Sequence, residues 1–131
     1  MEPKLDTTSR KFLRWAGIMG FLAIIAGTFG AHALPKDMTP ENMAIFETGV
    51  RYHIAHALAL LACARIFRAG LPARIAFWGF NLGIVFFSVA LYVLALTDIK
   101  KLGMIAPIGG LLLLTGWFAM ILEANREPAQ E

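Results

Sequence analysis

All three histidines of this chain lie between residues 27 and 61, and they are the side chains best suited to chemistry. His53 and His56 are three residues apart, a spacing that makes two side chains neighbours on a helix surface. His32 comes near the end of the apolar run that precedes them. Imidazole changes charge near neutral pH and is a common metal ligand, so these residues can relay protons or hold a metal.

Other polar and aromatic side chains accompany the histidines. Glu47 and Arg51 are one helical turn apart, which predicts an ion pair on one side of the helix, while His56 lies roughly on the opposite side. The predicted topology collects these groups at one depth, and we group them as a candidate polar cluster. Its members are His32, Glu47, Arg51, Tyr52, His53, His56 and Tyr92.

Four interpretations of this polar cluster are open. A metal would need carboxylate or thiolate ligands at suitable spacing, and these are missing. Haem would need His32 to face His53 or His56 at a matched depth. The cluster can instead serve a proton relay or a site for a quinol or lipid headgroup. We favour the fourth interpretation, in which the histidines hydrogen-bond neighbouring helices beside a satisfied Glu47–Arg51 pair, and we assign no metal and no cofactor.

The composition indicates a membrane protein. Hydrophobic residues make up 58% of the 131 residues and charged residues 16%, against about 45–50% and about 25% in soluble domains. The mean hydropathy is +0.65. A soluble domain of this size would need polar side chains over most of its surface, and this chain has too few of them.

Four apolar runs have the length of about 20 residues that a helix needs to cross the hydrocarbon core. They cover residues 15–34, 50–67, 75–96 and 104–122. We predict an all-α integral membrane protein with a single domain, an antiparallel bundle of four transmembrane helices, and mobile tails at 1–9 and 124–131. The basic residues before the first run and Ala31-His32-Ala33 after it have the form of a signal peptide, but we expect this run to remain as the first span.

A short amphipathic helix is predicted between the first two spans. Thr39 is a candidate N-cap, and Pro40 suits the first helical position. Met43 and Phe46 begin an apolar stripe that continues into the second span. We therefore expect Pro40–Gly49 to lie along the membrane surface and to run into the second span.

Glycines recur at helical spacing within three of the spans. Small residues let helices approach closely in a membrane, where packing drives association. Gly79 and Gly83, for example, form a GxxxG pattern in the third span. The predicted helix-packing residues are Gly20, Gly27, Gly30, Gly79, Gly83, Gly109 and Gly110.

The basic residues predict the orientation. With an even number of spans, both termini and the loop at 68–74 share one side, which carries eight of the 12 lysines and arginines. The positive-inside rule places that side in the cytoplasm. In this topology Trp117 falls toward the cytoplasmic face, whereas Tyr52 and Tyr92 fall toward the outer face.

Signatures of the common enzyme classes are absent from the sequence. It has no glycine-rich phosphate loop and no pair of catalytic carboxylates, and Asn81 stands where a nucleophile elbow would carry serine. Cys63 is the only cysteine, so no intrachain disulfide can form. The basic residues are spread over the loops, which does not favour nucleic-acid binding.

Three stretches have a distinctive sequence. They are GTFGAHAL at Gly27–Leu34, FETGVRYH at Phe46–His53 running into HALAL at His56–Leu60, and PIGG at Pro107–Gly110 with Gly116 and Trp117. Together they resemble the domain-of-unknown-function 423 family of small membrane proteins. The resemblance implies a four-span bundle in the bacterial inner membrane, without an established activity or catalytic residues. The third span departs from the family at Val89, where a small residue is expected.

We therefore predict a non-enzymatic membrane protein, either an accessory or structural subunit of a membrane complex or a small homo-oligomer. The alternative is transport of protons or small solutes, or binding of a lipid or quinol headgroup, through the polar cluster. The expected partners are membrane lipids, a larger membrane protein complex or a second copy of the chain, and no nucleic acid.

Overall fold

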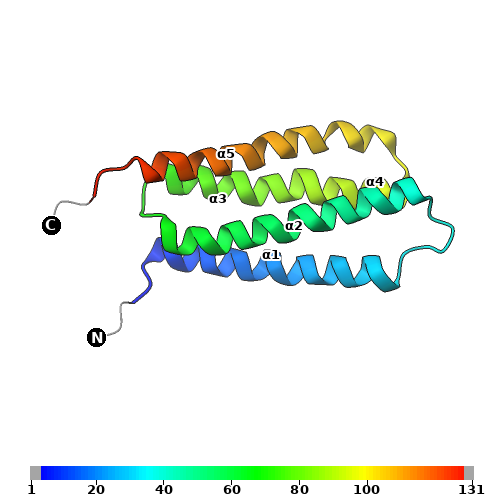
Figure 1. Cartoon of the computed structure of the whole chain (residues 1–131), viewed down its shortest axis with the longest axis horizontal. Helices are drawn as coiled ribbons and strands as arrows, with labels where there is room; N and C mark the ends of the chain where they lie inside the picture. Colours follow the sequence, from blue (N-terminus) through cyan, green and yellow to red (C-terminus); the bar gives the residue numbers. More distant parts are fainter. Residues whose placement is uncertain (1–3, 129–131) are drawn as a thin grey trace.

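The computed structural model describes residues 4–128, and every regular element within them is a helix, which confirms the predicted all-α class. The elements are α1 (Thr7–His32), α2 (Pro40–Ile66), α3 (Leu71–Ile84), the π-helix η1 (Val85–Val89), α4 (Ala90–Thr97), the 3-10 helix η2 (Lys100–Met104) and α5 (Ala106–Ala124). Because α3, η1 and α4 follow one another directly, the chain forms four long rods (Figure 1).

Successive rods run in opposite directions, so that both ends of the chain lie at the same end of the molecule (Figure 1). The first helix packs along α2, and α5 packs along α3, while α2 also contacts α3 and α4 and so lies between α1 and the third rod. The centre of the molecule is filled by buried side chains from all four rods, among them Phe12, Leu60, Phe80 and Leu113.

Three helical segments are long and apolar enough to cross a membrane, namely Thr7–His32, Leu71–Thr97 and Lys100–Ala124. The second rod, α2, is not among them, although its 27 residues match the others in length. It carries four charged residues, Glu41, Glu47, Arg51 and Arg65, which lower its hydropathy.

The separate amphipathic helix predicted at Pro40–Gly49 is not present. Thr39 accepts a hydrogen bond from the Asn42 backbone N–H at 3.2 Å and caps a single helix that continues to Ile66. Phe46 is buried against Phe29 and Tyr92 instead of facing a membrane surface. The apolar stripe that predicted an interfacial helix therefore packs against other helices of the molecule.

The first helix begins inside the predicted N-terminal tail at 1–9, whereas α5 ends at Ala124, where the predicted tail at 124–131 begins. Asp6 accepts a hydrogen bond from the Ser9 backbone N–H at 2.6 Å, so α1 begins at Thr7 and takes up the end of the predicted tail at 1–9. At the other terminus the backbone carbonyl of Glu127 accepts a hydrogen bond from Arg68. Residues 1–3 and 129–131 lie outside the described part of the chain.

The third rod contains a π-helix at Val85–Val89, within the stretch that departs from the family at Val89. A Cβ atom built at Gly109 of α5 would collide with the backbone of Phe86 and Phe87, so α5 lies directly against this wider turn. Val89 itself is 40% exposed, which explains why a small side chain is not needed at that position.

The predicted packing glycines have unequal surroundings. Close contacts concentrate between α3 and α5, where a Cβ at Gly79 would lie 2.5 Å from Thr115 Oγ1 and one at Gly83 would lie 2.5 Å from Leu113 Cδ2. A Cβ at Gly30 would lie 2.8 Å from the Phe46 ring.

The other three predicted packing glycines are less enclosed. A Cβ at Gly27 or Gly110 would make only ordinary contacts, at 3.5 Å and 3.9 Å, and one at Gly20 would meet no atom within 4 Å. Gly20 therefore makes no close helix contact within the described chain, because its face of α1 is not covered by another helix.

We predict that Gly109→Ala lowers the free energy of unfolding by about 1–3 kcal/mol, because the added methyl group would enter the backbone of η1. Gly110→Ala is the matched control, since its methyl group has room and alanine favours a helix more than glycine does. Unfolding in mixed detergent micelles, followed by circular dichroism, measures both variants. Equal destabilisation by the two substitutions would contradict this account of the packing.

Candidate functional site

His56 is hydrogen-bonded through both nitrogens of its ring. Nε2 lies 3.1 Å from the indole nitrogen of Trp117, and Nδ1 lies 2.7 Å from the backbone carbonyl oxygen of Tyr52. An indole N–H only donates and a carbonyl only accepts, so Nε2 is the acceptor and Nδ1–H is the donor. His56 is thus a neutral imidazole with its proton on Nδ1, and it links α2 to α5.

Aromatic rings surround this histidine. Tyr52 stacks on it with ring centroids 5.9 Å apart, and Phe80 and Trp117 lie at 5.8 Å and 6.0 Å. His56 is only 6% exposed. A metal ion or a second proton at Nε2 would displace the Trp117 hydrogen bond, so the geometry fits a cross-link between helices better than a carrier of protons or metals.

His53 joins α2 to α4 in a similar way but with one nitrogen free. Its Nδ1 lies 3.0 Å from the Tyr92 hydroxyl, and the ring also lies near the backbone carbonyl of Met19 on α1. Within residues 4–128 its Nε2 has no hydrogen-bond partner, and neither do Asn81 Oδ1 and Ser88 Oγ. All three side chains are buried, so the core around the third rod is more polar than its sequence alone suggests.

The predicted polar cluster is therefore divided. Tyr52, His53 and His56 of α2 lie toward the third rod and α5, where Tyr92 of α4 meets His53. Glu47 and Arg51 are exposed on the other side of α2. The predicted Glu47–Arg51 ion pair does not form, because no nitrogen of Arg51 lies within 4.0 Å of a Glu47 oxygen.

The spacing of Glu47 and Arg51 permits contact but does not enforce it, and exposed side chains lose conformational freedom when they pair. His32 is also exposed, at the end of α1, and it is not part of either group. Among the described residues no group of three His, Cys, Asp or Glu side chains is placed to hold a metal ion.

A groove follows the α1–α2 pair. At one end it is a hollow of about 310 Å³ between Gly17 and Gly20 of α1 and Leu58 and Leu61 of α2. A Cβ atom built at Gly17 or Gly20 would meet no atom within 4 Å, so these glycines form an open floor.

A second hollow, of about 350 Å³, lies nearer the other end of the pair and is lined by Gly27 and Ala31 of α1 and by Glu47, Arg51 and Ile54 of α2. At 100° per residue, the lining residues of each helix fall within one face, so the two hollows lie on the same side of the pair. We call them together the α1–α2 groove.

A second groove lies between α2 and α5. It has a volume of about 640 Å³ and a mostly apolar lining, which includes Phe87 of η1 and Leu113 of α5. Tyr52 and His56 line it from α2, and Trp117 lines it from α5. In this α2–α5 groove, aromatic side chains that can form hydrogen bonds therefore lie beside apolar side chains.

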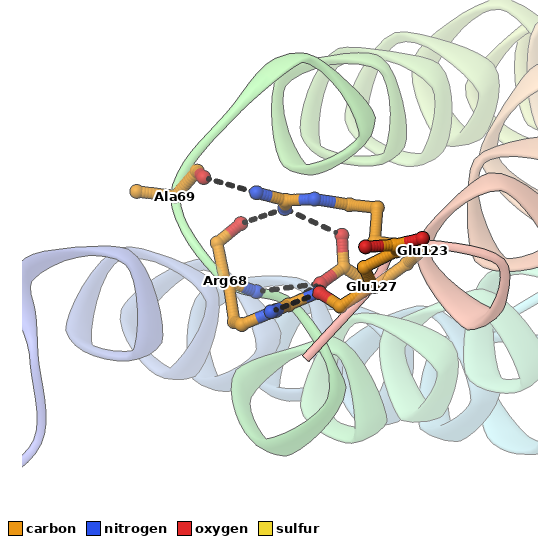
Figure 2. A network of polar contacts seen from close by, with 5 residues as sticks. Arg68, Ala69, Glu123 and Glu127 are labelled. Atoms are coloured by element: carbon orange, nitrogen blue, oxygen red, sulfur yellow. Dashed lines mark hydrogen bonds and ion pairs between the residues drawn. The ribbon is translucent and has the colours of Figure 1, made fainter. Parts of the chain in front are cut away.

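A buried carboxylate that the sequence analysis missed closes the end of the molecule at which both termini lie (Figure 2). Glu123 Oε1 accepts hydrogen bonds from the backbone N–H and the Nε–H of Arg68, each at 3.2 Å. Its Oε2 accepts from Arg126 Nη1 at 2.8 Å. Arg126 also donates to the carbonyls of Arg68 and Ala69, and Arg68 donates to that of Glu127. We call this network the Glu123 clamp.

A sequence signal for the clamp was available. Gly109, Gly116 and Glu123 are each seven residues apart, which places the carboxylate on the buried face of α5 that the glycines define. Glu123 is only 6% exposed, and a buried carboxylate requires charged or hydrogen-bonding partners. Arg126 is three residues further along the chain, but Arg68 could be identified only once the loop after α2 was placed.

Three helices that can cross a membrane, in a chain of 131 residues, define a small helical membrane protein. The chain belongs to the family described as "Protein of unknown function (DUF423)", which matches residues 26–110. This match confirms the family resemblance drawn from the three distinctive stretches.

Two relatives illustrate the range of the family. The UPF0382 inner membrane protein YgdD of Escherichia coli (strain K12) is 38% identical over 125 residues, which cover 91% of this chain and 92% of the relative. The UPF0382 membrane protein SH2409 of Staphylococcus haemolyticus is 38% identical over 112 residues, covering 85% and 92%. These names support a membrane location and state no activity. No solved structure matches the chain.

We predict that Trp117→Phe lowers the free energy of unfolding by about 1–2 kcal/mol, because it leaves His56 Nε2 buried without a donor. Trp78→Phe is the control, since Trp78 is exposed. Nitrogen-15 NMR of the parent protein should show the neutral tautomer with the proton on Nδ1. A charged His56 at neutral pH, or equal stability of the two variants, would contradict the assigned hydrogen bonds.

We also predict that Glu123→Gln destabilises the protein by about 1.5–3 kcal/mol, because two charge-assisted hydrogen-bond sets are weakened in a buried position. Glu127→Gln serves as the control, since Glu127 contributes its backbone carbonyl to the clamp. Thermal unfolding in one detergent compares the two variants, and a loss of stability confined to Glu127→Gln would rule out the clamp.

Proposed function

We propose that this chain is a non-enzymatic membrane protein with four spans that acts as an accessory or structural subunit and receives a transmembrane helix in its α1–α2 groove. The observation that carries the proposal is the open glycine floor of that groove. Helices associate in lipid through close packing against small residues, and Gly17 and Gly20 offer a surface that nothing in the described chain covers.

The proposal takes α2 as the fourth span. Its 27 residues give about 40 Å of helix, more than the roughly 30 Å of hydrocarbon. Three of its charged residues, Glu41, Glu47 and Arg51, lie toward one end and Arg65 lies at the other, where long side chains reach the polar interface. The rod also lies between two of the three apolar segments, because it packs along α1 on one side and contacts α3 and α4 on the other.

Both termini are proposed to face the cytoplasm, with the chain in the bacterial inner membrane. The name of the Escherichia coli relative supports the membrane. The orientation is supported by the excess of basic residues at the end where the termini lie. Glu47 and Arg51 then line the α1–α2 groove near its outer end and offer a partner helix polar contacts.

The absence of catalytic activity belongs to the same proposal. The histidine with the richest surroundings, His56, already uses both ring nitrogens in hydrogen bonds, so it offers neither a general base nor an open ligand. This arrangement also gives little support to proton transport through His56.

We predict that the protein purified from its native membrane in a mild detergent carries another membrane protein in a fixed ratio, identified by mass spectrometry. Gly20→Leu should remove this partner, because the leucine fills the groove, and should leave the fold intact, because the position is open. Ile108→Phe, which adds bulk at an exposed position of α5, is the control.

The outcomes of this experiment are distinct. A second copy of the chain that Gly20→Leu removes would support a homo-oligomer formed through the same groove. A partner that survives Gly20→Leu would show that the groove is not the docking surface, and a monomer free of other proteins would overturn the proposed function.

A second candidate function is binding of an amphiphilic lipid or quinol in the α2–α5 groove. Its support is the volume of about 640 Å³ beside Tyr52 and Trp117, which combines an apolar wall with groups that suit a polar head. Mass spectrometry of bound lipids tests it. A lipid or quinol species retained by the parent and lost in Gly110→Phe, which fills this groove, would favour this candidate.

A further inference from the structure

A third cavity lies at the end of the molecule where the termini emerge, apart from both grooves. It has a volume of about 250 Å³ and lies between the first turns of α1 and the start of α3. Polar groups line it from both helices: the threonines Thr7 and Thr8, the cations Lys11 and Arg74, and the backbone at Gly70. Of the residues that the structure describes, no acidic one lines it.

The two cations of this cavity have no anionic partner within residues 4–128. Among the described basic side chains, Arg68 and Arg126 bind Glu123 and Lys100 binds Asp98, and the others form no ion pair. Lys11 is instead held over the Phe77 ring, with its ammonium 3.9 Å from the ring centroid. This contact fixes the ammonium at the edge of the cavity and leaves its hydrogen-bond donors available.

The backbone of α3 adds further donors. Gly70 occupies the N-cap position of α3 without a side-chain acceptor, and Pro72 has no N–H, so the uncapped donors of the first turn are the N–H groups of Leu71 and Ala73. The N-terminal end of a helix carries partial positive charge. Cations from two helices, two hydroxyl groups and this helix end therefore meet in one cavity, and all of them suit a group with several anionic oxygens.

We propose that this cavity binds the phosphate group of an anionic membrane lipid. The surrounding surface favours a lipid over a soluble phosphate. Phe12 and Phe77 give the cavity an apolar side, and the exposed side chains of Trp15 and Trp78 come one turn further along α1 and α3. Tryptophan is enriched at the level of lipid headgroups, so a lipid held here would have its phosphate among the cations and its acyl chains along the molecule.

The proposal is tested on the full chain in detergent by native mass spectrometry and by titration with short-chain phosphatidylglycerol, phosphatidylcholine and inorganic phosphate. We expect phosphatidylglycerol to bind, and the double variant Lys11→Gln/Arg74→Gln to weaken its binding by about tenfold or more. Lys100→Gln/Lys101→Gln, which removes two charges at the opposite end, should bind as the parent does. Lys11→Arg should retain binding, because the cation is kept.

Each outcome has a definite meaning. Thermal unfolding and circular dichroism check that the variants fold. We expect them to fold because both substituted residues are exposed. Inorganic phosphate could instead bind as tightly as the lipid and with the same dependence on Lys11 and Arg74. That result would identify the ligand as a soluble phosphate and overturn the proposed lipid. Equal binding by the parent and the Lys11→Gln/Arg74→Gln variant, or by phosphatidylcholine and phosphatidylglycerol, would overturn the site.

Discussion

The direct contact between the backbones of α3, η1 and α5 is the constraint on which the rest of the structure depends. At Gly79, Gly83, Gly109 and Gly116 an added Cβ atom would lie within 3 Å of the facing rod, so none of these four positions has room for a side chain. Because α5 lies so close to the third rod, Trp117 reaches across to His56 on α2. The hydrogen bonds of the core and the wall of the α2–α5 groove are thus consequences of small residues elsewhere, and this is the form that helix association takes in lipid, where packing replaces the hydrophobic effect.

The helical class could be predicted because apolar runs of membrane length admit few other structures. The start of α2 followed its local signal, since Thr39 caps the helix through its side chain as predicted, whereas the cap at Asp6 was missed. The continuity of α2 was missed because an amphipathic stripe looks the same whether it faces lipid headgroups or a neighbouring helix. The π-helix at Val85–Val89 could not be predicted from hydropathy, because it lies where Gly109 of another rod approaches the backbone.

The polar cluster shows the same limit. Helical periodicity correctly separated His56 from Glu47 on α2, because that separation depends only on position along one helix. It could not identify Trp117 as the partner of His56, because that contact depends on how α5 packs beside α2. The Glu47–Arg51 pair failed for a different reason, since a favourable spacing does not decide the conformation of two exposed, flexible side chains. The residue types were enough to identify candidate residues, but only the contacts between helices show which of them interact.

The position of the Glu123 clamp also has a consequence for the order of assembly during synthesis. The first two helices pack mainly on each other and are translated first, so this pair can form while the rest of the chain is still in the ribosome. The loop after α2 contributes Arg68, yet its carboxylate partner belongs to the last turn of the last helix. The clamp is therefore a late event: until Glu123 has been translated, Arg68 and the carbonyls of its loop remain available to water, lipid or the insertion machinery.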